Sequence, residues 1–147
     1  MAQDAVAEVP TSERLARRWF EVVEQGALDQ LTELVHSDIV VVSKVRSGLV
    51  VEGREDFAQF VEETLSRSLY HASADVYRPL DERCVVVEGR LRWTDDEQVM
   101  RDDPVTWALE FEDDLLVRFV PARTPLEAET ILATPRDSDV DSTEVPG

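Results

Sequence analysis

Apolar residues recur with a helical period in three stretches of the first half of the chain. The first stretch ends at Gly26, after an apolar face made of Leu15, Trp19, Val22 and Val23. The second covers 27–38, where glycine at the preceding break supplies the backbone freedom of a helix end. The third covers 54–69 and is the clearest, with an apolar face of Phe57, Phe60, Val61, Thr64, Leu65 and Leu69. The pattern therefore predicts three N-terminal helices.

The period changes to two in the rest of the chain, which is typical of strands. The predicted strands cover 39–45, 49–52, 72–80, 84–94, 104–111 and 115–122. Asp113 and Asp114 are predicted to form a hairpin turn, and 95–103 the longest loop. Adjacent strands with little helix between them require antiparallel pairing. The sequence thus predicts an α+β domain whose helices lie on one face of a curved antiparallel sheet.

Strand alternation predicts which side chains face the helices. In 104–111 one face is apolar, with Val105, Trp107, Leu109 and Phe111, and the other holds Thr106, Ala108 and Glu110. In 84–94 the same rule places the charged side chains of Glu88, Arg90 and Arg92 on the outer face. Charges of alternating sign can pair across strands at a subunit interface or simply contact water. Both readings stay open at this point.

The composition of the chain limits the classes of molecule that it can bind. The chain has 147 residues, enough for one domain, and a formal net charge of −17. Such an excess of carboxylates excludes nucleic acid and anionic membrane as partners. No apolar stretch has the length of a transmembrane helix, so we expect a cytoplasmic protein. The only cysteine, Cys84, is expected in the core.

The ends of the chain differ from its middle in lacking a periodic apolar face. We expect a flexible N-terminus over 1–12, a folded domain over 13–132 and a disordered acidic tail over 133–147. Within the last segment of the domain, Thr124 precedes a proline and stands three residues before Glu127. This spacing predicts that Thr124 caps a short C-terminal helix.

Several segments together resemble the NTF2-like superfamily, and its SnoaL-like branch in particular. They are Gly26 with Leu28, the HSD sequence at 36–38, Gly53-Arg54-Glu55, VVVEGRLRW at 85–93 and LLVRFVPARTPLEA at 115–128. The resemblance covers about 13–132 and implies a cone-shaped fold: a curved sheet around a cavity, often assembled as a homodimer through the outer sheet face. It implies no cofactor.

The positions that carry chemistry in relatives hold other residues here. Relatives that isomerise ketosteroids use a tyrosine and two aspartates, and the matching positions look like Trp19, Ser43 and Trp107. An isomerase needs a carboxylate to move a proton and strong donors at the enolate oxygen, which serine and indole do not supply. The aspartate that cyclases use near the last strand is matched by Thr124. The resemblance therefore predicts that the usual catalytic acids are absent.

Two further residues are candidates for acid or base chemistry. His71 precedes a strand that would border the cavity mouth, and Asp75 is the nearest carboxylate to an inward position. His36 is expected at the end of the second helix. There a favourable interaction with the helix C-terminus is a sufficient structural reason for a histidine. Neither histidine has a neighbouring carboxylate motif, and the acidic loop at 95–103 lacks the spacing of a calcium loop, so no metal site is predicted.

Aromatic residues stand out as the lining of the cone. Together with one serine they are the predicted ligand contacts: Trp19, Ser43, Phe57, Phe60, Tyr77, Trp93 and Trp107. Rings of this size either fill the cone or surround a flat hydrophobic ligand. Three functions stay open: a protein that binds a small hydrophobic molecule, an isomerase, cyclase or hydrolase with a non-standard residue set, and a dimeric non-catalytic adaptor with a filled cone.

Overall fold

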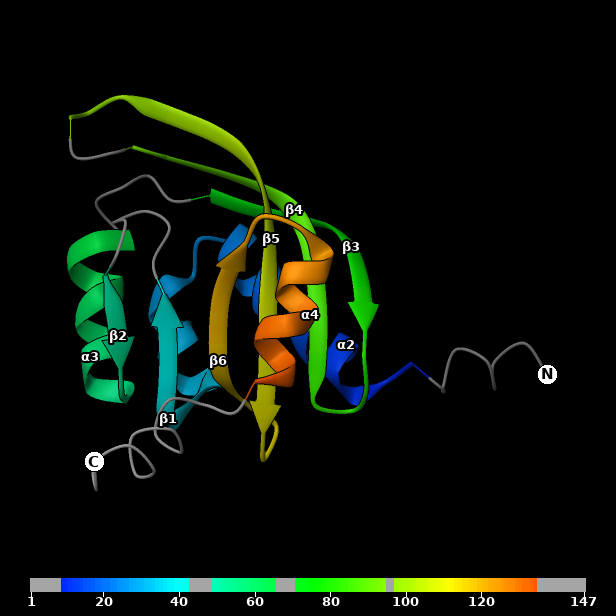
Figure 1. Cartoon of the computed structure of the whole chain (residues 1–147). Coiled ribbons are helices and arrows are strands. Elements are labelled where there is room, and N and C mark those ends of the chain that lie inside the picture. Colours follow the sequence, from blue (N-terminus) through cyan, green and yellow to red (C-terminus); the bar gives the residue numbers. More distant parts are fainter. Residues whose placement is uncertain (1–8, 43–48, 66–70, 95–96, 135–147) are drawn as a thin grey trace, which may run out of the picture.

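In the computed structural model of the protein, the described residues form one six-stranded sheet with helices on both faces (Figure 1). The structure describes residues 9–42, 49–65, 71–94 and 97–134. Its helical segments are α2 (Thr11–Glu24), η1 (Leu28–Leu34), α3 (Arg54–Phe60), η2 (Val61–Leu65) and α4 (Pro125–Ala133). Its strands are β1 (Val35–Val42), β2 (Val50–Glu52), β3 (His71–Pro79), β4 (Cys84–Thr94), β5 (Met100–Glu112) and β6 (Leu115–Ala122).

The three predicted N-terminal helices are present, with changes in type and length. Gly26 has a φ of +74° after α2, as a left-handed helix end requires. The second helix, η1, is a tighter 3₁₀ helix that ends at Leu34. The third begins as an α-helix, continues as a short π-helix in η2 and is described as far as residue 65. Residues 66–69 of the predicted helix lie outside the described ranges.

His36 is not at a helix end, and that prediction was wrong. Because β1 begins at Val35, His36 is the second residue of a strand. The β-branched run that starts at Ile39 extends the strand backward over the HSD sequence, since β-branched residues favour extended backbone. Residues 43–45 of the predicted strand, including Ser43, lie outside the described residues.

The start of α2 also differs from the prediction. The helix begins at Thr11, so residues 11 and 12 belong to the folded part of the chain and not to a flexible N-terminus. The fully buried Ser12 donates a hydrogen bond to the carbonyl of Asp81 at 2.6 Å, and Glu82 accepts one from the Thr11 N–H at 3.1 Å. These bonds fasten the N-terminus of α2 to the β3–β4 turn.

The sheet has the strand order β2-β1-β6-β5-β4-β3. All pairs are antiparallel except β1 and β6, which run parallel. The expectation of a purely antiparallel sheet was therefore wrong at one pair. Parallel neighbours need a long connection, and here the remaining strands and α3 supply it between the first and last strands of the chain. The curved α+β architecture itself is confirmed.

The hairpin between β4 and β5 is longer than predicted. The two strands pair from Cys84 with Glu110 to Thr94 with Met100, so residues 100–103 of the predicted 95–103 loop are strand. Cross-strand ion pairs explain why acidic residues are accepted there: Asp102 lies 3.2 Å from Arg90 and 3.4 Å from Arg92. At the opposite end of the sheet, Asp113 and Asp114 have φ values of 55° and 66°, which confirms the predicted tight turn.

The two faces of the sheet carry different layers. One face packs against α2, η1 and α3 and forms the main hydrophobic core. The helix α4 lies across the other face, where the buried Ala128 meets Val86 and Ala108 (Figure 1). The predicted cap is confirmed, because the Thr124 hydroxyl accepts a hydrogen bond from the Glu127 N–H at 3.1 Å. Part of the outer face is thus covered by the chain's own C-terminal helix.

Among the described residues, no helix combines the length and the apolar character that crossing a membrane requires.

Candidate ligand site

Aromatic rings from two helices and two strands meet on the inner face of the sheet. Trp19 of α2 lies between Phe57 of α3 and Phe119 of β6, with ring centroids 6.0 and 5.8 Å apart. Phe20, the next residue of α2, packs against Trp107 of β5 with 4.9 Å between the ring centroids and a tilt of 45°. Contacts at these separations fix each ring by its neighbours. The interior of the curved sheet is therefore an aromatic cluster.

The rings differ in how much surface they retain. Phe20, Phe57 and Trp107 are 1% exposed and form the base of the cluster. A second group keeps 5–7% of its surface accessible: Trp19, Phe60, Trp93 and Phe119. Each of these four side chains keeps a small accessible surface, and a ligand can contact only surface that is accessible. These rings are the ones that an interior ligand would contact.

The structure places five of the predicted ligand contacts in one buried core, with Tyr77 packed against its edge. Trp19, Phe57, Phe60 and Trp107 are linked by ring contacts, directly or through a further ring. Trp93 belongs to the same buried core. Ser43 lies outside the described residues.

Tyr77 occupies the edge of the aromatic cluster. Its ring stands edge-on to Phe20 at 6.4 Å, and the Arg17 guanidinium covers it at 4.2 Å from the ring centre. Burial raises the pKa of the Tyr77 hydroxyl, and the charge of Arg17 partly opposes this rise. The phenol therefore stays protonated near neutral pH and can donate a hydrogen bond but not serve as a base.

Sequence reasoning missed two rings of the cluster, Phe20 and Phe119. Phe20 follows Ala16 by four residues, so the helical period places both on one buried face, and this signal was present in the sequence. Phe119 was hidden by a bulge: Phe111 pairs with Leu116, but Glu110 pairs with Arg118. The extra residue in β6 shifts the alternation, so that Leu116 and Phe119 both face the core.

The two candidates for acid or base chemistry do not meet in the interior. His71 is exposed and pairs with Arg92, on the side of β3 opposite the fully buried Ala72. Asp75 is exposed as well and is the extra residue of a bulge between Ala74 and Val76. A catalytic role for either residue stays a prediction, and neither lies among the aromatic rings.

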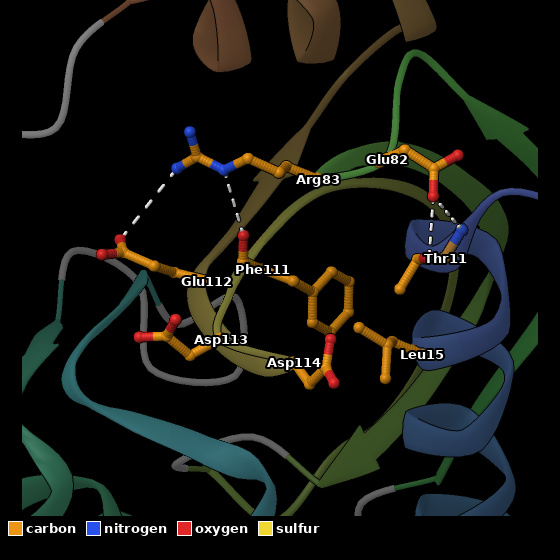
Figure 2. Close-up of a pocket in the computed structure, with 8 residues that line it drawn as sticks. All are labelled: Thr11, Leu15, Glu82, Arg83, Phe111, Glu112, Asp113 and Asp114. Atoms are coloured by element: carbon orange, nitrogen blue, oxygen red, sulfur yellow. Dashed lines mark hydrogen bonds and ion pairs between the residues drawn. The ribbon is translucent and has the colours of Figure 1, made fainter.

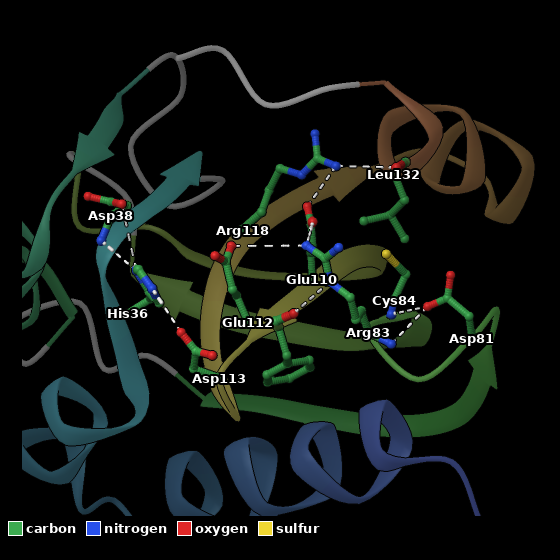
Figure 3. Close-up of polar contacts among 11 residues, drawn as sticks. His36, Asp38, Asp81, Arg83, Cys84, Glu110, Glu112, Asp113, Arg118 and Leu132 are labelled. Atoms are coloured by element: carbon green, nitrogen blue, oxygen red, sulfur yellow. Dashed lines mark hydrogen bonds and ion pairs between the residues drawn. The ribbon is translucent and has the colours of Figure 1, made fainter. Parts of the chain in front are cut away.

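The structure places two carboxylates beside His36 that the sequence had not associated with it. Ligand atoms of His36, Glu112 and Asp113 lie within 4.8 Å of one another (Figure 3). The Asp38 N–H donates to Nδ1 of His36 at 3.0 Å, which puts the proton of the neutral ring on Nε2. Nε2 lies 3.9 Å from the Asp113 carboxylate. Nε2 is therefore the nitrogen that carries a proton toward Asp113, and a metal ion there would have to displace that proton.

On the outer face, a buried ion-pair network fastens α4 (Figure 3). Glu110 contacts Arg118 at 2.9 Å and Arg83 at 2.8 Å, and Arg118 also donates to the carbonyls of Leu132 and Thr134. The last carbonyls of a helix lack partners within it, so Arg118 satisfies the C-terminal end of α4. This network lies across the sheet from the aromatic cluster.

Cys84 adjoins the same network and is half-buried. Burial raises the pKa of its thiol to about 11, and the charges of Asp81 and Glu110 add to the rise. The nucleophilic form of cysteine is the thiolate, which is scarce at neutral pH when the pKa is this high. Cys84 is therefore a structural residue and a poor nucleophile.

The sequence profile of the SnoaL-like domain family matches residues 16–119. No curated protein sequence matches the chain at a significant level. The family match spans every element from α2 through most of β6, and so includes all the rings of the aromatic cluster.

Solved structures share the fold at low sequence identity. RV0760c from Mycobacterium tuberculosis in complex with estradiol-17β-hemisuccinate matches with a TM-score of 0.68 and 10% identity, over 79% of this chain and 95% of that one. The Δ5-3-ketosteroid isomerase from a Mycobacterium species matches with a TM-score of 0.66 and 14% identity, over 82% and 97%. A computationally designed 17-OHP binder matches with a TM-score of 0.66 and 9% identity, over 79% and 95%.

Proposed function

Because the chain belongs to the SnoaL-like domain family, we propose that it binds a small, flat hydrophobic molecule on the inner side of its curved sheet. The observation that carries this proposal is the aromatic cluster itself. Its rings come from α2, α3, β5 and β6, and they pack against one another in the buried core on the inner face of the sheet. Ligand pockets of this kind are lined mainly by apolar and aromatic side chains.

The position of the buried charges favours a neutral ligand. Among the described residues, the buried charged side chains are Glu110 and Arg118, and these pair with each other on the outer face. A charged ligand group on the inner face would lose its hydration without meeting an opposite charge from this pair, which is costly. An uncharged ligand avoids this cost. The proposed ligand is therefore apolar over most of its surface.

The shape of the cluster favours a flat molecule. Trp19 and Phe119 stand at 42° to each other with 5.8 Å between their centres, and each keeps 5–7% of its surface accessible. A rigid ring system can lie against such tilted faces with little loss of conformational entropy. The names of two structural neighbours mention a steroid ligand or binder, which supports choosing steroids as the first class to test.

Titration with estradiol, followed by tryptophan emission, tests the proposal. We expect a saturable change in emission, because Trp19 and Trp93 both belong to the inner face and keep some accessible surface. Phe60→Ala removes a ring with 7% exposure and is expected to weaken binding about tenfold. Leu126→Ala, which removes a 73% exposed side chain of α4, is the matched control and should bind like the wild type.

Two results would contradict this proposal. A lack of any saturable change across neutral steroids and flat polyketide-like compounds would favour the alternative of a non-catalytic adaptor with a filled cone. Equal weakening in the Phe60→Ala and Leu126→Ala variants, each confirmed to be folded by circular dichroism, would show that binding does not involve the inner face.

The homodimer stays part of the proposal. The outer face carries cross-strand pairs of Arg78 with Glu88 and of Arg90 with Asp102, next to the part that α4 covers. These charges are already paired within one chain, so a second copy would contact a neutralised surface with little desolvation of single charges. Light scattering in solution tests this assembly, and a mass near 16.7 kDa would contradict it.

A further inference from the structure

A cavity that none of the rings of the aromatic cluster lines opens at the end of the sheet where the β3–β4 and β5–β6 turns meet the start of α2 (Figure 2). Its volume is about 600 Å³. Cavities that bind small molecules commonly have volumes of about 300–1,000 Å³. The cavity is therefore large enough for a ligand, and its lining decides which kind.

The inner wall of this cavity is apolar. Phe111 of β5 and Leu15 of α2 face each other there (Figure 2). Phe111 is 4% exposed and belongs to the hydrophobic core, and the half-buried Leu15 packs against that core. A hydrocarbon group that covered these two side chains would remove apolar surface from water, which is favourable.

The rim of the cavity is acidic. Four carboxylates and one guanidinium line it, which gives a formal charge of −3. Asp113 and Asp114 are exposed at the tip of the β5–β6 turn, and Glu112 precedes them. Among the described residues, Asp114 has no ion-pair partner, and the contact of Asp113 with His36 is long, at 3.9 Å. Negative charge at this rim is therefore only partly neutralised.

The positive groups near the cavity are already engaged. Glu82 accepts hydrogen bonds from the Thr11 N–H at 3.1 Å and from its hydroxyl at 2.7 Å, so the positive end of α2 has a carboxylate on it. Both bonds lower the pKa of Glu82 and keep it ionised, and the bond from the Thr11 hydroxyl has the larger effect. Arg83 binds Glu110 at 2.8 Å and the Phe111 carbonyl at 3.3 Å.

Arg14, whose charge acts on Glu82, is also engaged. Arg14 donates to the Val9 carbonyl at 2.8 Å and to the Thr11 hydroxyl at 3.2 Å. An anionic ligand would thus have to displace existing partners of Arg83, Thr11 or Arg14, whereas a cationic one meets carboxylates with spare acceptor sites. The charge distribution around the cavity therefore favours a cationic ligand over an anionic one.

We propose that this cavity binds a small organic cation, in which a protonated amine at the Asp113–Asp114 rim is joined to an apolar body that covers Leu15 and Phe111. This site is distinct from the aromatic cluster, where the proposed function places a neutral ligand. Its lining contains none of the rings of that cluster, and it opens at the turn end of the sheet. The net charge of −17 also raises the local concentration of cations at such a rim.

Three probes with one shape and different charge test the proposal: 4-phenylbutylamine, 4-phenylbutanol and 4-phenylbutyrate. Each is titrated into the full ¹⁵N-labelled chain, and amide chemical shifts give both affinity and location. We expect the amine to bind at least about tenfold more tightly than the alcohol, with the carboxylate weakest. The shifts should centre on Thr11–Leu15 and 111–115 and should spare the tryptophan indole signals.

Paired variants isolate the role of the rim. Asp113→Asn with Asp114→Asn keeps the turn, because asparagine adopts positive φ readily, and removes two charges. This variant should bind the amine about tenfold more weakly. Asp29→Asn with Glu129→Gln removes two exposed charges away from the cavity lining and should change the affinity less than twofold if the effect is local.

Three outcomes would overturn the proposal. They are equal affinity for the amine and the alcohol, equal weakening by the two double variants, and shifts centred on the indole signals. The last outcome would assign amine binding to the inner face while leaving the proposed function standing. Amine binding at the rim without any estradiol binding would instead contradict the proposed function and support the cation site. The two proposals can therefore fail separately.

Discussion

Replacing Gly89 with alanine is expected to destabilise the fold severely. A Cβ atom at this position would lie 1.9 Å from the Ser73 carbonyl oxygen and 2.9 Å from the Ala74 Cα. Both neighbours are backbone atoms of β3, so no side-chain rotation can relieve the clash. The change should cost more than the roughly 1–3 kcal/mol typical of overpacked cores, because β3 itself must move.

The reason lies in the curvature of the sheet. Gly89 pairs with Ala74 just before the β3 bulge, and a bulge bends a strand and increases its twist. Glycine permits the close approach of the two backbones that this bend requires. Urea unfolding followed by circular dichroism measures the effect, and loss of folded protein on expression would agree with it.

Gly26→Ala is the matched control for this prediction. Gly26 also has a special conformation, with a φ of +74°, but a Cβ there would meet nothing within 4 Å. Only backbone strain remains, which costs about 1 kcal/mol. An unfolding free energy that falls equally in the two glycine variants would contradict the account of the β3–β4 approach.

The second large effect is expected for Trp107→Ala. Trp107 is 1% exposed and contacts Phe20 at 4.9 Å and Phe119 at 6.1 Å, so its removal leaves a cavity at the base of the aromatic cluster. Truncation of a buried tryptophan costs about 3–5 kcal/mol, a large share of the about 5–15 kcal/mol that stabilises a typical domain. Urea unfolding at 25 °C measures this loss.

Trp107→Phe separates packing from a special role of the indole. Phenylalanine keeps a ring against Phe20 and leaves a smaller void, so less than half of the alanine loss is expected. A Trp107→Ala variant as stable as the wild type would show that the cluster is loosely packed at its base. The inner wall of the proposed ligand site would then lack the rigid support assigned to it here.

The periodic signals in the sequence predicted most of the fold. The helical period gave α2 and α3, and alternation in 84–94 and 104–111 separated the core face from the outer face correctly. These patterns work because each depends on one element and its own burial. The tight turn at Asp113 and Asp114 was accessible for the same reason.

Features that depend on how two strands pair could not be predicted from the residue pattern of either strand alone. The parallel pairing of β1 with β6 joins strands more than 70 residues apart, and nothing within either strand specifies it. The acidic residues at 102 and 103 indicate a loop until Arg90 and Arg92 are seen across the strand. The bulge in β6, which turns Phe119 inward, likewise needs the register with β5.

The candidate site was predicted in kind but not in detail. Large aromatic residues on predicted core faces indicated Trp19, Phe57, Phe60 and Trp107, all of which share one cluster. The acidic cavity could not be foreseen, because its lining comes from α2 and two turns that are distant in sequence. Only the assembled fold brings Leu15 against Phe111 and the Asp113–Asp114 turn.

The central claim is that the inner face of the sheet binds a small hydrophobic molecule. The most direct test uses the indole N–H signals of the three tryptophans, Trp19, Trp93 and Trp107, in a ¹⁵N-labelled chain titrated with estradiol. Variants Trp19→Phe and Trp93→Phe assign the signals. We predict saturable shifts of the Trp19 and Trp93 signals, because both rings keep accessible surface, and a smaller shift for Trp107. Binding that leaves all three signals in place, or no binding at all, would contradict the claim.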